Sequence, residues 1–277
     1  MKKNNLHYAF AILLLPFIIY VFLPYFTDDF SDLRQEKENK AEEQRLLEEA
    51  RLVKEKEEKI YLMGRFEPKE RPEFSLVPLS YTLAGNEVYL RGETLEAFRQ
   101  MRDTALLEGV DLKIASATRN FDYQKGIWEN KWTGVTFVEG KNLAQTLPSG
   151  LERFKKILEY SAAPGISRHH WGTDIDINAA TVKYFETETG KRVYEWLDQN
   201  ALRFGFCQTY NEKDSVRFSG YNEEKWHWSY LPLARGFTKR FQELIKEEDI
   251  KGFLGDEYVS EQSLIADYVL GINSECI

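Results

Sequence analysis

The sequence predicts an α+β fold, because segments with helical periodicity and segments with strand periodicity follow one another without a regular strand–helix–strand rhythm. Hydrophobic residues make up 43% of the chain and aromatic residues 14%, which is enough to build a buried core. A highly charged stretch ends near residue 60. From about Tyr61 onward the composition is typical of a globular domain. We therefore expect one folded domain over residues 61–277, preceded by segments of another kind.

Apolar spacing predicts the individual elements of this domain. Thr94–Glu108 places Leu95, Phe98 and Met101 on one face, as an amphipathic helix does. Asp111–Ala117 alternates apolar and polar residues and is expected to form a strand. Further helices are expected over Phe154–Tyr160, Arg192–Phe204, Phe237–Glu247 and Glu261–Leu270, and a further strand over Lys225–Tyr230.

The amino-terminal part predicts a membrane anchor. Residues 8–26 form an uncharged run of the length that crosses a bilayer, about 17–25 residues. Basic residues precede this run and acidic residues follow it, which favours a cytoplasmic segment 1–7, a transmembrane signal anchor 8–26 and an exported body. We therefore expect a single-pass protein of the cytoplasmic membrane with its domain on the extracytoplasmic side, periplasmic or cell-wall. A long, cleaved signal peptide is the alternative.

Residues 27–60 are predicted to form a charged helical stalk. From Arg34 to Ile60 the chain consists almost entirely of Glu, Lys, Arg, Gln and Ala, which is typical of a solvated helix. Such a helix would extend over roughly 40 Å at 1.5 Å per residue. Its few apolar residues are too sparse to predict a coiled coil, and weak self-association through the stalk is the alternative.

The net charge and the cysteine content restrict the classes of partner and the cellular compartment that are expected for this protein. The net charge of -8 argues against a nucleic-acid-binding protein, which needs a basic face to neutralise phosphates. Cys207 and Cys276 are the only cysteines. Outside the membrane an even number of cysteines favours a disulfide, and a bridge here would tie down the end of the chain. In a reducing compartment they would be two ordinary buried thiols.

Two short stretches carry the residues of a catalytic zinc site. Three of the four histidines lie in them, and His169, Asp176 and His227 supply two imidazoles and a carboxylate. A catalytic zinc is typically held by three protein ligands and keeps one open position. We therefore expect one Zn²⁺ per chain. Glu224 is the candidate base, and Glu223, its chemically identical neighbour, competes with it.

The spacing of these residues makes further predictions. His169 and Asp176 are too far apart for one helical face and suit a loop that leads into a strand. On a strand, Glu224 and His227 would face opposite sides, so a local twist or bulge is expected. Asp174 alternates with Ile175, so it should lie near the metal side, where it would orient a ligand histidine or bond a neighbouring backbone group.

The motifs resemble those of a known group of enzymes. Ser167, His169, Gly172 and Asp176 are similar to the SxHxxGxAxD pattern of the LAS metallopeptidases, which include lysostaphin-like, D-alanyl-D-alanine and hedgehog domains. Glu224-Lys225-Trp226-His227 resembles the ExWH pattern of the D-Ala-D-Ala branch, and Ser116–Gln124 resembles the segment with its essential arginine. The chain looks like a VanY-type D-alanyl-D-alanine carboxypeptidase. Asp174 departs from the pattern, which has a small residue there.

The resemblance implies a fold and a set of roles. It implies a hedgehog/D-Ala-D-Ala peptidase-like single domain with a small antiparallel sheet and flanking helices. The metal ligands would be His169, Asp176 and His227, with His170 a supporting or structural residue. The remaining roles that it implies are general base and acid for Glu224, contact with the scissile carbonyl for Arg119, and substrate binding for Arg119, Ser167 and Gln124.

The implied activity is zinc-dependent removal of the terminal D-Ala from peptidoglycan stem peptides. An L,D-carboxypeptidase or an endopeptidase of the same fold would use the same catalytic residues. A non-catalytic, hedgehog-like zinc-binding module is a further alternative. The presence of both Glu224 and Arg119 counts against such a module, because binding alone requires neither.

Overall fold

The computed structural model describes the chain at residues 6–83, 85 and 87–277, with side chains from residue 33 onward. It divides into two compact units, Met1–Lys56 and Glu57–Ile277. The predicted domain boundaries at residues 7, 26 and 60 stay predictions.

Helix α1, Leu6–Leu62, contains the predicted stalk. Its side chains from residue 33 to 54 are exposed, and they form pairs one turn apart such as Arg34–Glu38 and Arg51–Glu48. Each such pair stabilises a helix by about 0.2–0.5 kcal/mol. The side chains of residues 8–26, the predicted membrane anchor, lie outside the described residues. Among the residues that are described, no helix is both long and apolar enough to cross a membrane.

A four-stranded antiparallel sheet forms the centre of the second unit, with the strand order β3-β4-β6-β5. Its strands are β3 (Ile114–Ser116), β4 (Asp174–Ile177), β5 (Phe206–Gln208) and β6 (His227–Tyr230). A separate antiparallel pair is formed by β1 (Phe74–Leu76) and β2 (Tyr89–Arg91). The α+β class and the small antiparallel sheet are therefore confirmed.

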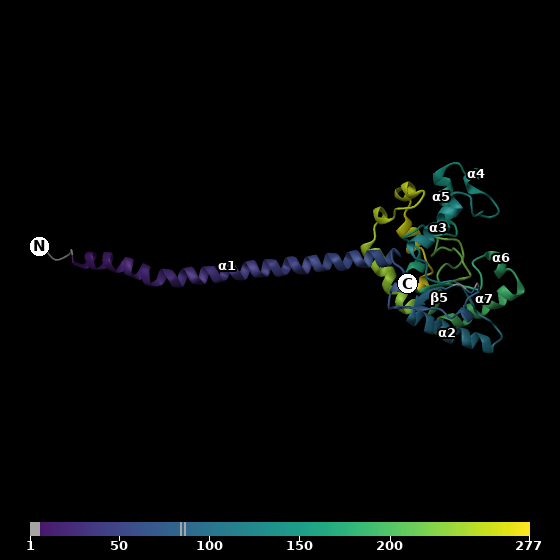
Figure 1. Ribbon diagram of the computed structural model, residues 1–277, viewed down its shortest axis with the longest axis horizontal. Helices are drawn as coiled ribbons and strands as arrows, with labels where there is room; N and C mark the ends of the chain where they lie inside the picture. The colour runs from purple at the N-terminus through teal and green to yellow at the C-terminus, as the bar shows by residue number, and fades with distance from the viewer. Residues whose placement is uncertain (1–5, 84, 86) are drawn as a thin grey trace. The chain divides into compact units, whose positions relative to one another are not determined.

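The helices of this unit form two groups (Figure 1), each with its own buried cluster. The helices α3, α4 and α5 pack near Trp128 and Phe154, whereas α2 and α7 pack around Phe98 and Trp196. The bounds are α2 Gly92–Leu107, α3 Phe121–Trp132, α4 Leu143–Thr146, α5 Gly150–Leu158, α6 Val182–Phe185, α7 Glu188–Asn200 and α8 Leu231–Leu244. Short 3-10 segments are η1 Pro68–Glu70, η2 Leu79–Tyr81, η3 Arg168–Trp171, η4 Ala201–Phe204, η5 Glu247–Asp249, η6 Asp256–Glu261 and η8 Ser274–Cys276, and η7 Ile265–Val269 is a π turn.

Several predicted elements have different bounds in the structure. The strand predicted over Asp111–Ala117 is confined to β3, and the helix predicted over Phe237–Glu247 begins earlier, with a proline in its first turn. Proline suits this position because its missing N–H would have no helical partner. The helix predicted over Glu261–Leu270 is shorter in the structure and is the π-helix η7, Ile265–Val269, which follows the end of η6.

Helix α3 was missed, although its start carries a local signal. Asn120 caps it by accepting a hydrogen bond from the backbone N–H of Tyr123 at 2.8 Å. Asparagine is among the residues preferred at this position. The predicted disulfide is confirmed, since Cys207 in β5 is bonded to Cys276 with a Cα–Cα distance of 5.7 Å.

Candidate metal centre

The register of the sheet brings the three predicted metal ligands together. Asp176 in β4 lies directly opposite His227 in β6. His169 lies in η3, which ends at Gly172 just before β4 begins. Gly172 has a φ of +73°, and a Cβ there would overlap the ring of Phe74. Glycine therefore permits the tight turn that returns the chain from His169 to Asp176.

The three side chains present one ligand atom each to a shared space. One such atom from each of His169, Asp176 and His227 lies within 4.8 Å of the others. The Oδ1 atom of Asp176 is 3.3 Å from Nε2 of His169 and 3.6 Å from Nδ1 of His227. All three residues are buried. This arrangement matches the ligand set predicted from the sequence.

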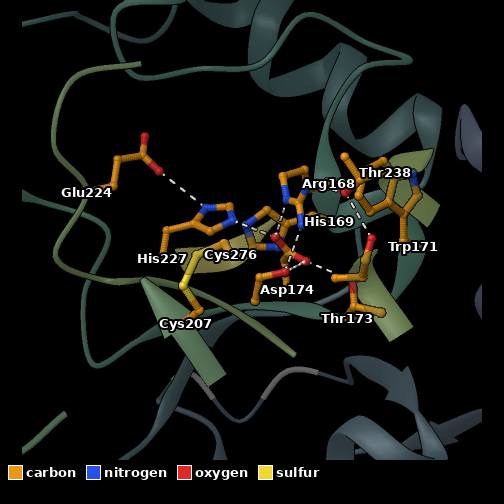
Figure 2. Close-up of polar contacts among 12 residues, drawn as sticks. Arg168, His169, Trp171, Thr173, Asp174, Cys207, Glu224, His227, Thr238 and Cys276 are labelled. Carbon is orange, nitrogen blue, oxygen red and sulfur yellow. Dashed lines mark hydrogen bonds and ion pairs between the residues drawn. A yellow bond between two sulfur atoms is a disulfide. The ribbon is translucent and has the colours of Figure 1, made fainter. Parts of the chain in front are cut away.

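Each imidazole is oriented by the nitrogen that faces away from the shared space. Nδ1 of His169 is 2.8 Å from the backbone oxygen of Ala117, and Nε2 of His227 is 2.9 Å from Oδ2 of Asp174 (Figure 2). A carbonyl or carboxylate oxygen accepts hydrogen bonds, so the proton belongs on these outer nitrogens. The inner nitrogens, Nε2 of His169 and Nδ1 of His227, are then available as ligands.

The polar atoms of this cluster are those that a metal ion would satisfy. Within the described residues, Nε2 of His169 and Oδ1 of Asp176 are buried and have no hydrogen-bond partner. Such buried, unsatisfied atoms are costly unless a further partner binds them. Two imidazoles and a carboxylate with an open position are a donor set that suits Zn²⁺. The residues present therefore fit a zinc ion.

Electrostatics keep His169 and Asp176 in the forms that bind a cation. Burial and the charge of Arg119 lower the pKa of His169, so its imidazole is neutral. Burial raises the pKa of Asp176, but its close contact with His169 and the charge of Arg119 outweigh burial and bring the pKa to about 2. Burial lowers the pKa of His227, but its bonds to Asp174 and Glu224 outweigh burial and raise the pKa to about 9. In the zinc-free protein this ring is therefore charged near neutral pH, and a cation would bind Nδ1 in place of its proton.

Glu224 lies beside the cluster without the bulge that the sequence predicted. Strand β6 begins at His227, and Glu224 precedes it in a turn. The turn is closed by a hydrogen bond of 3.2 Å from the backbone N–H of His227 to the backbone oxygen of Glu224. The carboxylate Oε2 lies 3.3 Å from Nδ1 of His227. Because Glu224 is not on the strand, the alternation of strand faces does not apply to it.

The two candidate bases differ in their surroundings. Glu224 is buried, and burial raises its pKa above the usual value. The side chain of Glu223 is 32% exposed and forms an ion pair with Lys225, 3.8 Å away. A buried carboxylate with a raised pKa is the better proton acceptor near neutral pH, so the geometry favours Glu224.

A small hollow of about 30 Å³ opens in front of the cluster. Among the predicted substrate residues, Arg119 and Ser167 line it. Gln124 does not, because its amide donates a hydrogen bond of 2.7 Å to the backbone oxygen of Ala162, which itself lines the hollow. The full lining is Arg119, Tyr160, Ser161, Ala162, Ser167, Arg168, His169, Tyr210, Tyr221, Glu224 and His227.

Other residues at this hollow were missed by the sequence analysis. The ring of Tyr210 packs against His227, with centroids 4.8 Å apart, and the buried hydroxyl of Tyr221 has no partner within the described part of the chain. Lys131 in α3 donates a hydrogen bond to the hydroxyl of Ser161, which lines the hollow. Nothing in the local sequence marks these residues, because their positions follow from how the loops pack.

His170 is a structural residue rather than a ligand. Its Nδ1 lies 2.6 Å from the backbone oxygen of Arg119, and its Nε2 accepts a hydrogen bond from the N–H of Gly165 at 3.1 Å. Burial lowers the pKa of His170 to about 3, so the ring is neutral. One nitrogen thus holds the segment that carries Arg119 and the other holds the turn at Gly165, which agrees with a structural role for His170 in the motif.

The chain is similar to known peptidases, and its resemblance to them is confirmed. Residues 87–233 match the family model described as VanY, D-alanyl-D-alanine carboxypeptidase. The class is thus that of the D-alanyl-D-alanine carboxypeptidases. The chain belongs to the VanY family.

Two curated relatives show the extent of the similarity. The chain is 32% identical over 151 residues to a D-alanyl-D-alanine carboxypeptidase of Enterococcus faecalis, covering 53% of this chain and 50% of the relative. It is 27% identical over 197 residues to the putative carboxypeptidase YodJ of Bacillus subtilis, covering 68% of this chain and 61% of the relative. The match therefore spans between half and two thirds of the length of these relatives.

Solved structures show a similar relationship. A zinc-bound variant of the vancomycin-resistance D,D-pentapeptidase VanY from the VanB-type cassette is 27% identical, with a TM-score of 0.42 and coverage of 67% of this chain and 94% of that chain. The LD-carboxypeptidase LdcB is 24% identical, with a TM-score of 0.45 and coverage of 71% and 80%.

Proposed function

We propose that the protein is a zinc-dependent carboxypeptidase that removes the terminal D-Ala from peptidoglycan stem peptides. Membership of the VanY family supports this activity. The observation that carries the proposal is the convergence of His169 Nε2, Asp176 Oδ1 and His227 Nδ1 beside the buried carboxylate of Glu224. One Zn²⁺ per chain would be held by these three residues.

A bound zinc ion would polarise the scissile carbonyl and lower the pKa of water. Glu224 is placed to take the proton of the attacking water, because its Oε2 lies next to the shared space of the ligands. Its raised pKa lets it keep that proton and then donate it to the departing amino group. The same side chain thus serves first as base and then as acid.

Two cationic side chains support a substrate with a free carboxylate. The nearest acidic oxygen to the guanidinium of Arg119 is Oδ2 of Asp176, 3.8 Å from Nη2, and Nε of Arg119 is buried without a partner among the described residues. Lys131 forms no ion pair within that same part of the chain and reaches the edge of the hollow through Ser161. Lys131, and Arg119 with its long contact to Asp176, therefore favour an anionic ligand at this partly buried site.

The size of the hollow supports a small leaving residue. The hollow is a space of about 30 Å³ bordered by Tyr160, Tyr210 and Tyr221. A methyl side chain fits such a space better than a long one does. The terminal carboxylate would then be received by Arg119 and Lys131, with Ser167 also on the wall of the hollow.

We further propose that residues 8–26 anchor the protein in the cytoplasmic membrane, with the domain on the extracytoplasmic side. The uncharged run and its flanking charges support this orientation. The disulfide is consistent with an oxidising compartment, where such bonds persist. Weak self-association through residues 27–60 stays a prediction.

The activity is tested with the full chain in detergent, loaded with zinc. Release of D-alanine would be measured from a stem pentapeptide ending in D-Ala-D-Ala and from the corresponding tetrapeptide. Cleavage of a cross-linked muropeptide would be measured as its separation into two peptides by chromatography. We expect release from the pentapeptide. Release only from the tetrapeptide would identify an L,D-carboxypeptidase, cleavage only of the cross-link an endopeptidase, and zinc binding without any cleavage a non-catalytic module.

A further inference from the structure

Asp174 makes a complete set of hydrogen bonds behind the metal ligand His227 (Figure 2). Its Oδ2 accepts from Nε2 of His227 at 2.9 Å and from Nε of Arg168 at 3.0 Å. Its Oδ1 accepts from the hydroxyls of Thr173, at 2.7 Å, and Ser229, at 2.8 Å. The side chain is fully buried, and both of its oxygens are occupied by donors. Asp174 is therefore committed to these partners and is not free to act as a metal ligand.

Arg168 is fully buried as well and neutralises Asp174. Its Nη1 donates to the hydroxyl of Thr238 at 2.8 Å and its Nη2 to that of Ser229 at 3.0 Å. The guanidinium also lies over the ring of Trp171, 4.6 Å from its centroid. Ser229 connects the two charges, since it accepts from Arg168 and donates to Asp174. The pair is thus held in one geometry from several sides.

We propose that the Arg168–Asp174 ion pair is a positioning device that determines which nitrogen of His227 faces the metal. The role rests on the proposed zinc site. A carboxylate that accepts from Nε2 keeps the proton on that nitrogen and directs the lone pair of Nδ1 toward Asp176. The negative charge also makes the imidazole a stronger donor to a cation. His169 has only a neutral backbone oxygen in the same position.

A purely structural role does not account for this pair. Two buried charges are expensive to desolvate, and replacing such a pair with apolar residues is often neutral or stabilising. The geometry also gives Asp174 a specific target, because the same Oδ2 that binds Arg168 binds His227. Arg168 therefore holds the carboxylate at the orientation in which it meets the imidazole.

The inference is tested on the full chain in detergent by measuring the dissociation constant for zinc by chelator competition. Asp174→Asn keeps the size of the side chain and removes its charge. The double variant Arg168→Met/Asp174→Ala removes both charges, so that neither is left buried and unpaired. We expect both variants to bind zinc about 10–100-fold more weakly, which is typical for loss of a group that orients a ligand.

Thr238→Val is the matched control, because it disturbs the same buried network without touching Asp174 or His227. It should bind zinc as the wild type does. A second readout is the exchange of the Nε2 proton of His227 in the zinc-loaded chain, followed by NMR, which four histidines keep tractable. This proton should exchange slowly in the wild type and the control, and rapidly in the double variant.

The outcomes separate this inference from the proposed function. Weaker zinc binding in both variants and faster proton exchange in the double variant, with the control unchanged, would support the positioning role. Wild-type affinity in both variants would overturn the positioning role and leave the zinc enzyme standing. A wild-type chain that binds no zinc would overturn the proposed function, and the positioning role with it.

Discussion

The two histidines of the candidate metal centre are oriented by different means. His169 is held by the backbone oxygen of Ala117, whereas His227 is held by the carboxylate of Asp174, which Arg168 neutralises. The first arrangement is built from main chain and no single side-chain change removes it. The second depends on buried side chains that can be exchanged one at a time. Substitutions around His227 can therefore change the orientation of its ring, whereas no single side-chain substitution removes the support of His169.

The largest effect is expected at the base beside His227. Glu224→Gln removes the proton acceptor but keeps the shape, and kcat should fall by about 10²–10⁴-fold. D-alanine release from the pentapeptide measures the effect, with zinc content as a check that the site is still loaded. Glu223→Gln is the matched control and should leave kcat unchanged, because Glu223 is outside the hollow. Equal losses of kcat in both variants would show that Glu224 is not the specific base.

The second largest effect is expected on the stability of the strands that carry His227, when the disulfide is removed. Cys207 lies in β5 opposite Ser229 of β6, and its bond to Cys276 closes a loop of 69 residues. Loss of the bond should lower the free energy of unfolding by about 4 kcal/mol, because the unfolded chain gains conformational freedom. Denaturant titration of Cys276→Ser against the oxidised wild type measures this loss. An unchanged midpoint would show that the tail contributes nothing to the sheet.

The two histidines should give opposite pH dependences to the stability of the zinc-free protein. The folded pKa of His227 is raised from 6.5 to about 9, so its contribution is complete below pH 6.5 and is lost as pH rises to about 9. This loss is on the order of 3 kcal/mol. The folded pKa of His169 is lowered, so stability falls as pH drops below 6.5 and the unfolded chain takes up the proton.

Single variants separate these two contributions. His227→Gln should flatten the alkaline side of the stability profile, and His169→Gln should flatten the acidic side. Denaturant titrations of the zinc-free proteins across pH 5–9.5 would show the difference. If both variants changed the dependence of stability on pH in the same way, the pKa values of the two histidines would not be shifted in opposite directions.

The smallest effect is expected away from both histidines, at the edge of the hollow that Lys131 reaches through Ser161. Lys131→Met should raise KM for the pentapeptide about 10–150-fold, since a hydrogen bond to a charged group contributes about 1.5–3 kcal/mol. Lys125→Met, on the same helix and paired with Glu129, is the control. A substrate with an amidated carboxyl terminus should lose the difference between Lys131→Met and the wild type. If KM is unchanged for the free acid, Lys131 does not bind the carboxylate.

Local patterns in the sequence were sufficient for part of this description. The α+β class, helix α2, the disulfide and the cluster of His169, Asp176 and His227 were all predicted, because each rests on periodicity, residue type or a short motif. Glu224 was predicted as the base, but on the assumption that it lies on the same strand as His227. In the structure that strand begins only at His227. That error arose because a turn and a strand start cannot be told apart in an aromatic-rich segment.

What the sequence by itself determined is the chemistry available: two imidazoles, two carboxylates and an arginine in stretches of recognisable spacing. What only the tertiary structure decided is which nitrogen each histidine presents, the partners of Asp174, and the arrival of Lys131 at the hollow. His227 and Asp174 are 53 positions apart, and they meet because β4 and β6 pair in one register. A shift of one residue would turn these side chains to the other face of the sheet. The orientation of the site is therefore a property of the sheet.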